Sequence, residues 1–191
     1  MVSVNADLPD AVAAACSGLA VAALVHDAHG EPDALLAAFA TAQRAAGYRV
    51  RGLLNLASAA TADGKCMVLV DVADPRVRYL ISQDLGTAAC GCSLDPRGLA
   101  DASAVLRRAL HEPAELAIVN RFGTLEAKGQ GMAAELLALM VAGIPLLTAV
   151  NRRHLEAWRM FSGGLAAELP LDAHALQVWW QACRALPAAR T

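Results

Sequence analysis

The polar residues that follow the short apolar run at 116–119 are the ones best suited to hold a ligand. Arg121, supported by Asn120 and Lys128, could clamp a tetrahedral oxyanion, because a guanidinium presents a planar fork of N–H donors and the helix expected after this turn adds the positive end of its dipole. Molybdate or tungstate would suit such a site. Glu126 could pair with Arg121 when the site is empty, or orient it when the site is full. The alternative is a surface loop with a Glu–Arg pair worth about 0 to 1 kcal/mol.

These residues stand at one end of a predicted β-α-β unit. The apolar runs at 116–119 and 146–150 each predict a buried strand, and apolar residues recur at helical spacing from Met132 to Met140 between them. Ligands of open parallel sheets bind outside the carboxyl ends of the strands. The polar stretch at 120–128 is therefore expected to line such a mouth.

The first predicted strand, at 19–25, leads through a polar loop into a helix, which is where P-loop and dinucleotide-binding folds hold phosphate. A P-loop needs Gly, four residues, Gly, Lys and then Ser or Thr. This loop lacks the lysine and brings in three carboxylates, at Asp27, Glu31 and Asp33. Like charges a few ångströms apart repel by roughly 1 to 4 kcal/mol per pair, so ordinary MgATP binding is not expected here.

Two interpretations of this loop remain open. It could be a plain strand-to-helix connection with Asp33 as the helix cap. It could instead retain a site for a different ligand, built from Asp27, His29 and Gly30. A cation held by Asp27 together with His26 or His29 is a variant of the second interpretation.

The middle of the chain predicts an antiparallel edge on a mostly parallel sheet. A strand at 48–55 is expected to form a hairpin with a strand at 66–71, and a third short strand follows at 78–83. The remaining helices are expected at 99–110, 152–161 and 172–185.

A second group of candidate residues follows the predicted strand at 78–83. Gln83, Asp84 and Cys92 could face the first group across the cleft. Cys90 with Cys92 is a weak metal candidate, since a structural zinc site needs four ligands and this pair supplies two. The alternative is that both are reduced thiols in a loop.

Composition narrows the class of protein. The chain has 191 residues, enough for one α/β domain over 1–191, with a loosely ordered leader at 1–17 and tail at 187–191. Its 16 basic and 18 acidic residues give a net charge of −2, which does not favour a nucleic-acid partner. The sequence has no uncharged apolar stretch of about 18 residues, so membrane insertion is not expected. An odd number of cysteines, five, fits a reducing cytoplasm.

The strings at 119–131 and 142–150, with Trp158, resemble a known bacterial family that carries a "domain of unknown function" label. The strings at 82–86 and 92–96 also fit, and the most specific part is Asn-x-Phe-Gly-x-x-Glu-x-x-Gly-x-Gly. Members of this family are similar to P-loop nucleoside triphosphatases of the thermophilic type. The resemblance covers about residues 19–182 and implies a P-loop-like three-layer α/β sandwich with a degenerate phosphate loop.

The resemblance also bears on chemistry. In those triphosphatases the matching strand ends in Asp-Glu followed by Gly-x-Met-Glu, whereas here Asn120 and Arg121 replace the acidic pair while Gly123 and Glu126 remain. Glu126 would be the catalytic residue, and Mg²⁺ the cofactor, if the protein were a triphosphatase. Genes of the family often stand beside molybdate-transport or nitrogenase genes, which implies a similar context for this chain.

Together these features predict a cytoplasmic oxyanion-binding protein, with molybdate or tungstate as its ligand, linked to molybdenum metabolism or transport. We expect a binding protein rather than an enzyme. The alternative is a nucleotide-binding protein or nucleoside triphosphatase with an atypical phosphate loop. A third class is a structural or regulatory partner of a transporter, with the tryptophan-bearing C-terminal helix as the interface. Such a protein could be a homo-oligomer or a transporter component.

Overall fold

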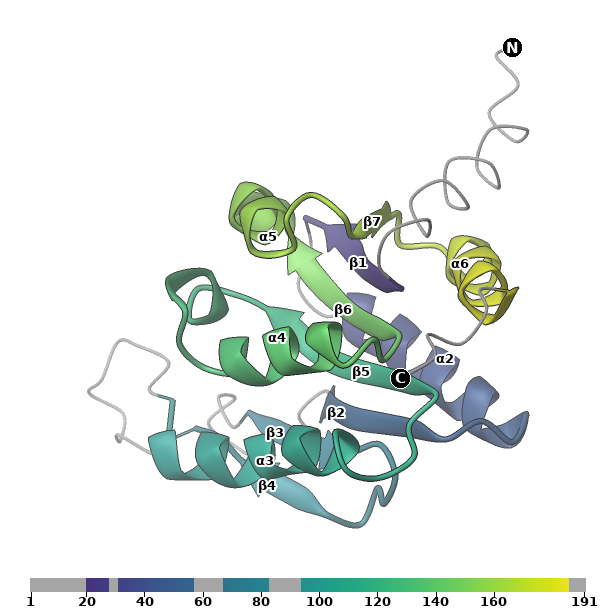
Figure 1. The fold of residues 1–191 in the computed structure, drawn as a ribbon. Helices are drawn as coiled ribbons and strands as arrows, with labels where there is room; N and C mark the ends of the chain where they lie inside the picture. Colours follow the sequence, from purple (N-terminus) through teal and green to yellow (C-terminus); the bar gives the residue numbers. More distant parts are fainter. Residues whose placement is uncertain (1–19, 28–30, 57–66, 83–93, 186–191) are drawn as a thin grey trace.

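The apolar runs form strands that pair side by side in one sheet, in the order β4-β3-β2-β5-β6-β1-β7 (Figure 1). The computed structural model describes residues 20–27, 31–56, 67–82 and 94–185. The strands there are β1 Val21–His26, β2 Val50–Leu56, β3 Val68–Asp71, β4 Arg78–Leu80, β5 Leu116–Phe122, β6 Leu146–Asn151 and β7 Ala167–Leu169. The helices are α2 Glu31–Ala45, α3 Pro96–Ala109, α4 Ala133–Val141, α5 Leu155–Phe161 and α6 Ala173–Ala185, with 3-10 turns η1 Glu126–Lys128 and η2 Arg152–His154.

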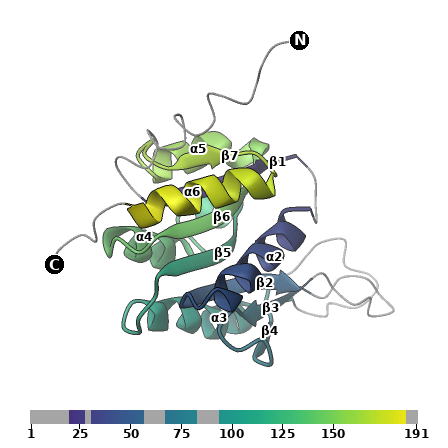
Figure 2. The same ribbon diagram turned by 90° about the vertical axis from the view of Figure 1, so that its right-hand side faces the viewer.

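Alternate side chains of the central strands go to opposite faces of the sheet. In β1, Val21 and Ala23 pack into the core beneath α3, α4 and α5, whereas Ala22 and Leu24 pack into the core beneath α2 and α6. Figures 1 and 2 show these two helix layers on either side of the sheet. A strand covered on both faces must be apolar at every position, which explains the continuous apolar runs in the sequence.

The five strands β2, β5, β6, β1 and β7 run parallel, and β3 and β4 add an antiparallel edge beside β2. The predicted α/β class, with a mostly parallel sheet and an antiparallel edge, is confirmed. The sequence interpretation did not include β7, because its three residues carry too little of the apolar pattern to be recognised as a strand.

The strand β5 extends further than the predicted run at 116–119, and its pairing with β6 is irregular at Asn120 and Arg121, two of the candidate ligand-binding residues. Val119 lies opposite Thr148, but Phe122 lies opposite Val150, so β5 has one more residue than β6 over this interval. The extra residue also changes the alternation, since Phe122 packs in the same core as Val119. Asn120 and Arg121 therefore lie in a bulge of a strand, and not in the turn that follows it. Such bulges redirect side chains next to functional sites.

The three tryptophans pack inside the molecule. Trp158 lies against Phe122 and Phe161 with ring centroids 5.2 and 6.2 Å away, and Trp179 and Trp180 of α6 are buried between that helix and the sheet. Both side chains are covered within the chain, so an interface on the C-terminal helix α6 would have to use its other residues. In the ranges described above, no helix has the length and apolar character to cross a membrane.

Candidate functional site

A small cavity lies where β1, β5 and β6 end, and we call it the inner cavity. Its volume is about 40 Å³, and its polar lining comes from His26, Arg121, Asn151, Arg153 and His154, with Gly123 beside them. Neighbouring parallel strands end at the same edge of the sheet. His26 therefore meets residues that follow it in the sequence by 95 positions or more. About three water molecules would fill this volume.

Arg121 reaches the inner cavity while it is bound to Asp33 in the first turn of α2. Its Nη2 donates to Asp33 Oδ2 at 2.8 Å and its Nε donates to Oδ1 at 3.3 Å. Asn55, at the end of β2, donates to the same Oδ2 at 2.9 Å. The Asp33 side chain is 6% exposed and that of Arg121 is 32% exposed, so the carboxylate is largely removed from water. Asp33 is thus the partner of Arg121, and not the helix cap that the sequence suggested, because α2 already begins at Glu31.

Glu126 closes the loop that follows β5. Its Oε2 accepts the backbone N–H of Gly123 at 3.0 Å, and its Oε1 accepts the backbone N–H of Met132 at 3.1 Å. The expected Glu126–Arg121 pair is therefore wrong: each residue has another partner. The loop also places the start of α4 at Ala133, and no residue of α4 lines the inner cavity. The dipole of α4 was expected to contribute to the site, but this helix does not line the cavity.

His154 and Arg153 come to the inner cavity from the turn after β6. Asn151 caps this turn, since its Oδ1 accepts the backbone N–H of Arg153 at 3.1 Å. The Nε of Arg153 donates to His154 Nε2 at 3.1 Å. Because a guanidinium can only donate, Nε2 must accept, and neutral His154 carries its proton on Nδ1.

The pKa of His154 agrees with this assignment. Burial lowers it from the ordinary 6.5, the positive charge of Arg153 lowers it further, and only Glu126 acts in the opposite direction. The Thr124 hydroxyl lies 3.2 Å from the same Nε2. The lone pair of Nε2 already accepts the Arg153 N–H. His154 is therefore not arranged as a base that activates the Thr124 hydroxyl as a nucleophile.

The other candidates from the β5 loop differ in position. Asn120 places its side-chain Oδ1 in a buried position, where it accepts no hydrogen bond from any described residue. Gly123 lies on the wall of the inner cavity. Lys128 is exposed at the end of η1 and does not line that cavity. The structure therefore brings Arg121 and Gly123 together and leaves Lys128 apart.

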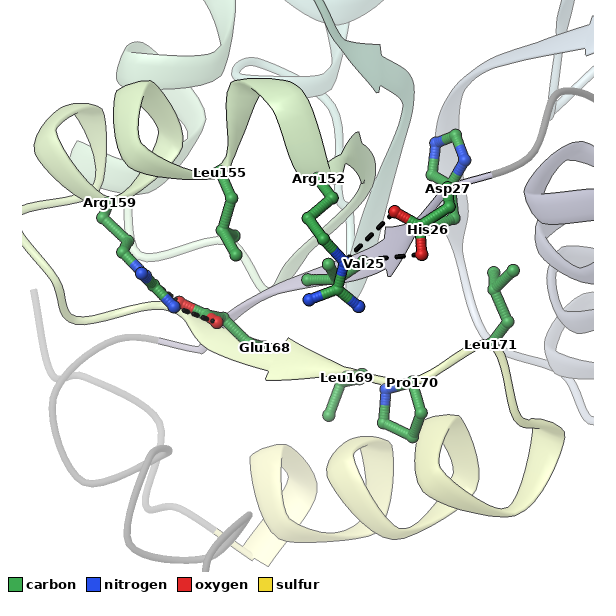
Figure 3. Close-up of a pocket in the computed structure, with 10 residues that line it drawn as sticks. All are labelled: Val25, His26, Asp27, Arg152, Leu155, Arg159, Glu168, Leu169, Pro170 and Leu171. Carbon is green, nitrogen blue, oxygen red and sulfur yellow. Dashed lines mark hydrogen bonds and ion pairs between the residues drawn. The ribbon is translucent and has the colours of Figure 1, made fainter.

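Asp27 belongs to a second, more open hollow, which we call the outer hollow (Figure 3). Its volume is about 500 Å³ and it lies among the ends of β1 and β7 and the start of α5. Asp27 pairs there with Arg152 at 3.1 Å, and Glu168 pairs with Arg159 at 2.6 Å. His26 lines both spaces. Asp27 has an arginine partner in place of the proposed cation.

Some predicted residues fall outside the described ranges, namely Gln83, Asp84, Cys90, Cys92, His29 and Gly30. Within those ranges, no group of three His, Cys, Asp or Glu side chains is placed to hold a metal ion. Mg²⁺ prefers carboxylate oxygens, and the end of β5 offers Asn120 and Arg121 instead. The residues present at this strand end do not fit a magnesium site.

The sequence allows Arg153 and His154 to reach this end of the sheet but favours a solvated helix end for them, and it does not single out Asn151, or Asp33 with Asn55, as site residues. A signal for the first three was available, because 151–154 directly follow an apolar strand next to β5. No such signal existed for Asp33 with Asn55, since their contact depends on how α2 crosses the end of β2.

The fold can be compared with a solved structure, the solution structure of a human cancer-related nucleoside triphosphatase. The TM-score is 0.64, with 13% sequence identity, over 90% of this chain and 99% of that one. At this identity the similarity concerns the fold alone. It confirms that the sheet and its helices have the arrangement of a nucleoside triphosphatase, as the resemblance implied.

Two sequence comparisons identify relatives. The molybdenum import ATP-binding protein ModC 2 of Bradyrhizobium diazoefficiens is 37% identical over 164 residues, which are 84% of this chain but 18% of that protein. This chain thus spans less than a fifth of its relative. A family model described as protein of unknown function (DUF2478) matches residues 21–179, which is most of the chain. The resemblance seen in the sequence is confirmed, and the chain belongs to the DUF2478 family.

Proposed function

We propose that this protein binds a small tetrahedral oxyanion in the inner cavity and acts in molybdenum handling. The observation that carries the proposal is that two arginines from neighbouring strand ends, Arg121 and Arg153, line one cavity of about 40 Å³. Guanidinium groups are well suited to the oxygens of such an anion, because they offer several N–H donors in a plane. The small volume favours an ion over a nucleotide.

The name of the relative supports molybdate or tungstate as the ligand. A 37% identical segment belongs to a protein named for molybdenum import, and molybdate is the tetrahedral oxyanion of that element. Asn151 and Gly123 line the same cavity. The proposal includes a cytoplasmic location, a single α/β domain and a role beside a transporter.

The test is a titration of the purified protein with molybdate, tungstate, sulfate and phosphate, followed by calorimetry and by the melting temperature. We expect molybdate and tungstate to bind and to raise the melting temperature. Arg153→Ala should weaken binding at least about tenfold, because a charge-assisted hydrogen bond is worth about 1.5 to 3 kcal/mol. Arg121→Lys should also weaken it, since lysine keeps the charge but loses the fork.

Lys128→Ala is the matched control, because it removes a cationic side chain of the same loop that does not line the inner cavity. Its affinity should equal that of the unaltered protein. The proposal fails if none of the four anions binds at millimolar concentration, or if Lys128→Ala weakens binding as much as Arg153→Ala.

Nucleotide binding is the second candidate, and the outer hollow favours it. About 500 Å³ is within the usual range for small-molecule sites, and the fold is that of a nucleoside triphosphatase. Catalysis is less well supported, because both carboxylate oxygens of Glu126 accept backbone N–H groups. Mg²⁺-dependent phosphate release that is lost in Glu126→Ala, at unchanged melting temperature, would favour this candidate over oxyanion binding.

A further inference from the structure

One of the two arginines of the inner cavity, Arg121, already has an anion bound to it from within the chain. Asp33 takes two donors of Arg121, Nε and Nη2, at 3.3 and 2.8 Å. Among the contacts of the described residues, Nη1 of Arg121 makes no hydrogen bond to the protein. An oxyanion that enters the cavity would therefore meet a guanidinium whose charge is offset and two of whose five N–H donors already bind Asp33.

The position of Asp33 is fixed by the fold. It lies in the first turn of α2, where the helix backbone holds it, and Asn55 donates to its Oδ2 at 2.9 Å from the end of β2. Its side chain is 6% exposed. A carboxylate with two partners and little water around it cannot swing away at low cost, since its hydrogen bonds would have to be replaced.

The bulge in β5 is what brings the arginine to this carboxylate. The extra residue between Val119 and Phe122 interrupts the alternation of the strand, and Arg121 reaches α2 on one side while it still lines the inner cavity on the other. The guanidinium of Arg121 thus binds Asp33 and also faces the inner cavity.

We propose that Asp33 is a built-in competitor for Arg121 that weakens oxyanion binding, and weakens the binding of dianions more than that of monoanions. This inference rests on the proposed oxyanion function and adds how its affinity is set. The reason is electrostatic: the repulsion between the Asp33 carboxylate and a bound anion is proportional to the charge of that anion.

The experiment compares Asp33→Asn with Asp27→Asn by calorimetric titration. Molybdate serves as the tetrahedral dianion and perrhenate as a tetrahedral monoanion of similar size. For a separation of roughly 8 Å in a partly wet site, loss of the Asp33 charge should strengthen perrhenate binding about threefold and molybdate binding about tenfold. Asp27→Asn is the matched control, because Asp27 is another aspartate paired with an arginine at this edge and it does not line the inner cavity. Its effect should be less than about twofold.

The outcomes separate the two proposals. If the unaltered protein binds molybdate and Asp33→Asn binds it no more tightly, the competitor is overturned and oxyanion binding stands. Equal gains for perrhenate and molybdate would also overturn it, since a change of shape would then explain the result. Binding by Asp33→Asn alone would support the competitor, but it would overturn oxyanion binding as the function of the unaltered protein. No binding by either protein overturns oxyanion binding and this inference with it.

A second measurement needs no variant of Asp33 and covers the case in which Asp33→Asn does not fold. The Nε–H signal of Arg121 in a ¹H–¹⁵N spectrum of the unaltered protein, assigned from its loss in Arg121→Lys, reports on the contact with Asp33. We expect molybdate at saturation to shift this signal. An unchanged Arg121 signal at saturation, together with shifts elsewhere around the inner cavity, would overturn the inference.

Discussion

The carboxyl edge of the sheet has two halves that use the same residue types in different ways. In the inner half, Asp33 and Arg121 are 6% and 32% exposed, and Asn55 also donates to Asp33. In the outer half, Asp27 and Arg152 are 74% and 64% exposed and face the outer hollow (Figure 3). Both are Asp–Arg pairs at about 3 Å. We expect the Asp33–Arg121 pair to stabilise the fold and to set the affinity for a ligand. We expect neither effect from the Asp27–Arg152 pair, because water screens its charges.

The largest difference between the halves should appear when the arginines are removed. Arg121→Ala leaves the Asp33 carboxylate nearly buried without its counter-charge, and should lower the free energy of unfolding by about 3 kcal/mol. This is the low end of the range for buried pairs, because Arg121 is partly exposed. Urea unfolding measures the change. A loss below about 1 kcal/mol would mean that the inner pair behaves like a surface pair.

The second effect concerns the other inner carboxylate, Glu126, whose two oxygens each accept a backbone N–H. Glu126→Gln should lower the free energy of unfolding by about 1 to 2 kcal/mol, because the amide can accept at only one atom and turns a donor toward the other N–H. Glu156→Gln is the control, since Glu156 is 83% exposed on α5, and it should unfold like the unaltered protein. Equal unfolding midpoints in urea for both variants would show that the hydrogen bonds of Glu126 do not stabilise the inner half.

The third effect is a dependence on pH. The pKa of His154 is lowered from its ordinary value of 6.5 by burial and by Arg153, so the unfolded chain binds a proton more readily than the folded chain does. The contribution of His154 is therefore fully present above pH 6.5 and is lost as the pH falls from 6.5 through the lower folded pKa. Melting temperatures across this window should fall more steeply for the unaltered protein than for His154→Gln. Parallel curves would show that His154 titrates as it does in the unfolded chain.

The smallest effect belongs to the outer half. Arg152→Ala removes an exposed partner of an exposed aspartate, and should change the free energy of unfolding by less than about 0.5 kcal/mol. Urea unfolding beside Arg121→Ala makes the comparison direct. A loss as large as that of Arg121→Ala would show that exposure does not distinguish the two pairs.

The main parts of the fold could be predicted from the sequence, because they depend on apolar pattern. Strands β1, β5 and β6 are continuous apolar runs, and α2 and α6 repeat apolar residues at helical spacing. The antiparallel edge followed from short alternating segments. The strand β7 was missed, because a three-residue strand owes its existence to its neighbour β1 and not to its own pattern.

The candidate site could be predicted only in part. Arg121 and Gly123, predicted in a turn after a strand, both line the inner cavity, although Arg121 lies within β5. Lys128 was grouped with them because it is near in the chain, but the loop closed by Glu126 leaves it outside the inner cavity. The distance in sequence between a residue and the end of a strand does not determine on which side of a ten-residue loop its side chain will lie.

By itself, the sequence of this protein determined the fold class, the family and the strand ends at which charged residues gather, because burial requires apolar runs and those runs are visible in one dimension. The tertiary structure alone decided which charges meet. An extra residue in β5 and the path of α2 bring Arg121 to Asp33 and Asn55, while Asp27 is left to Arg152 in solvent. Electrostatic energy depends on distance and on access of water, and both are properties of the folded chain.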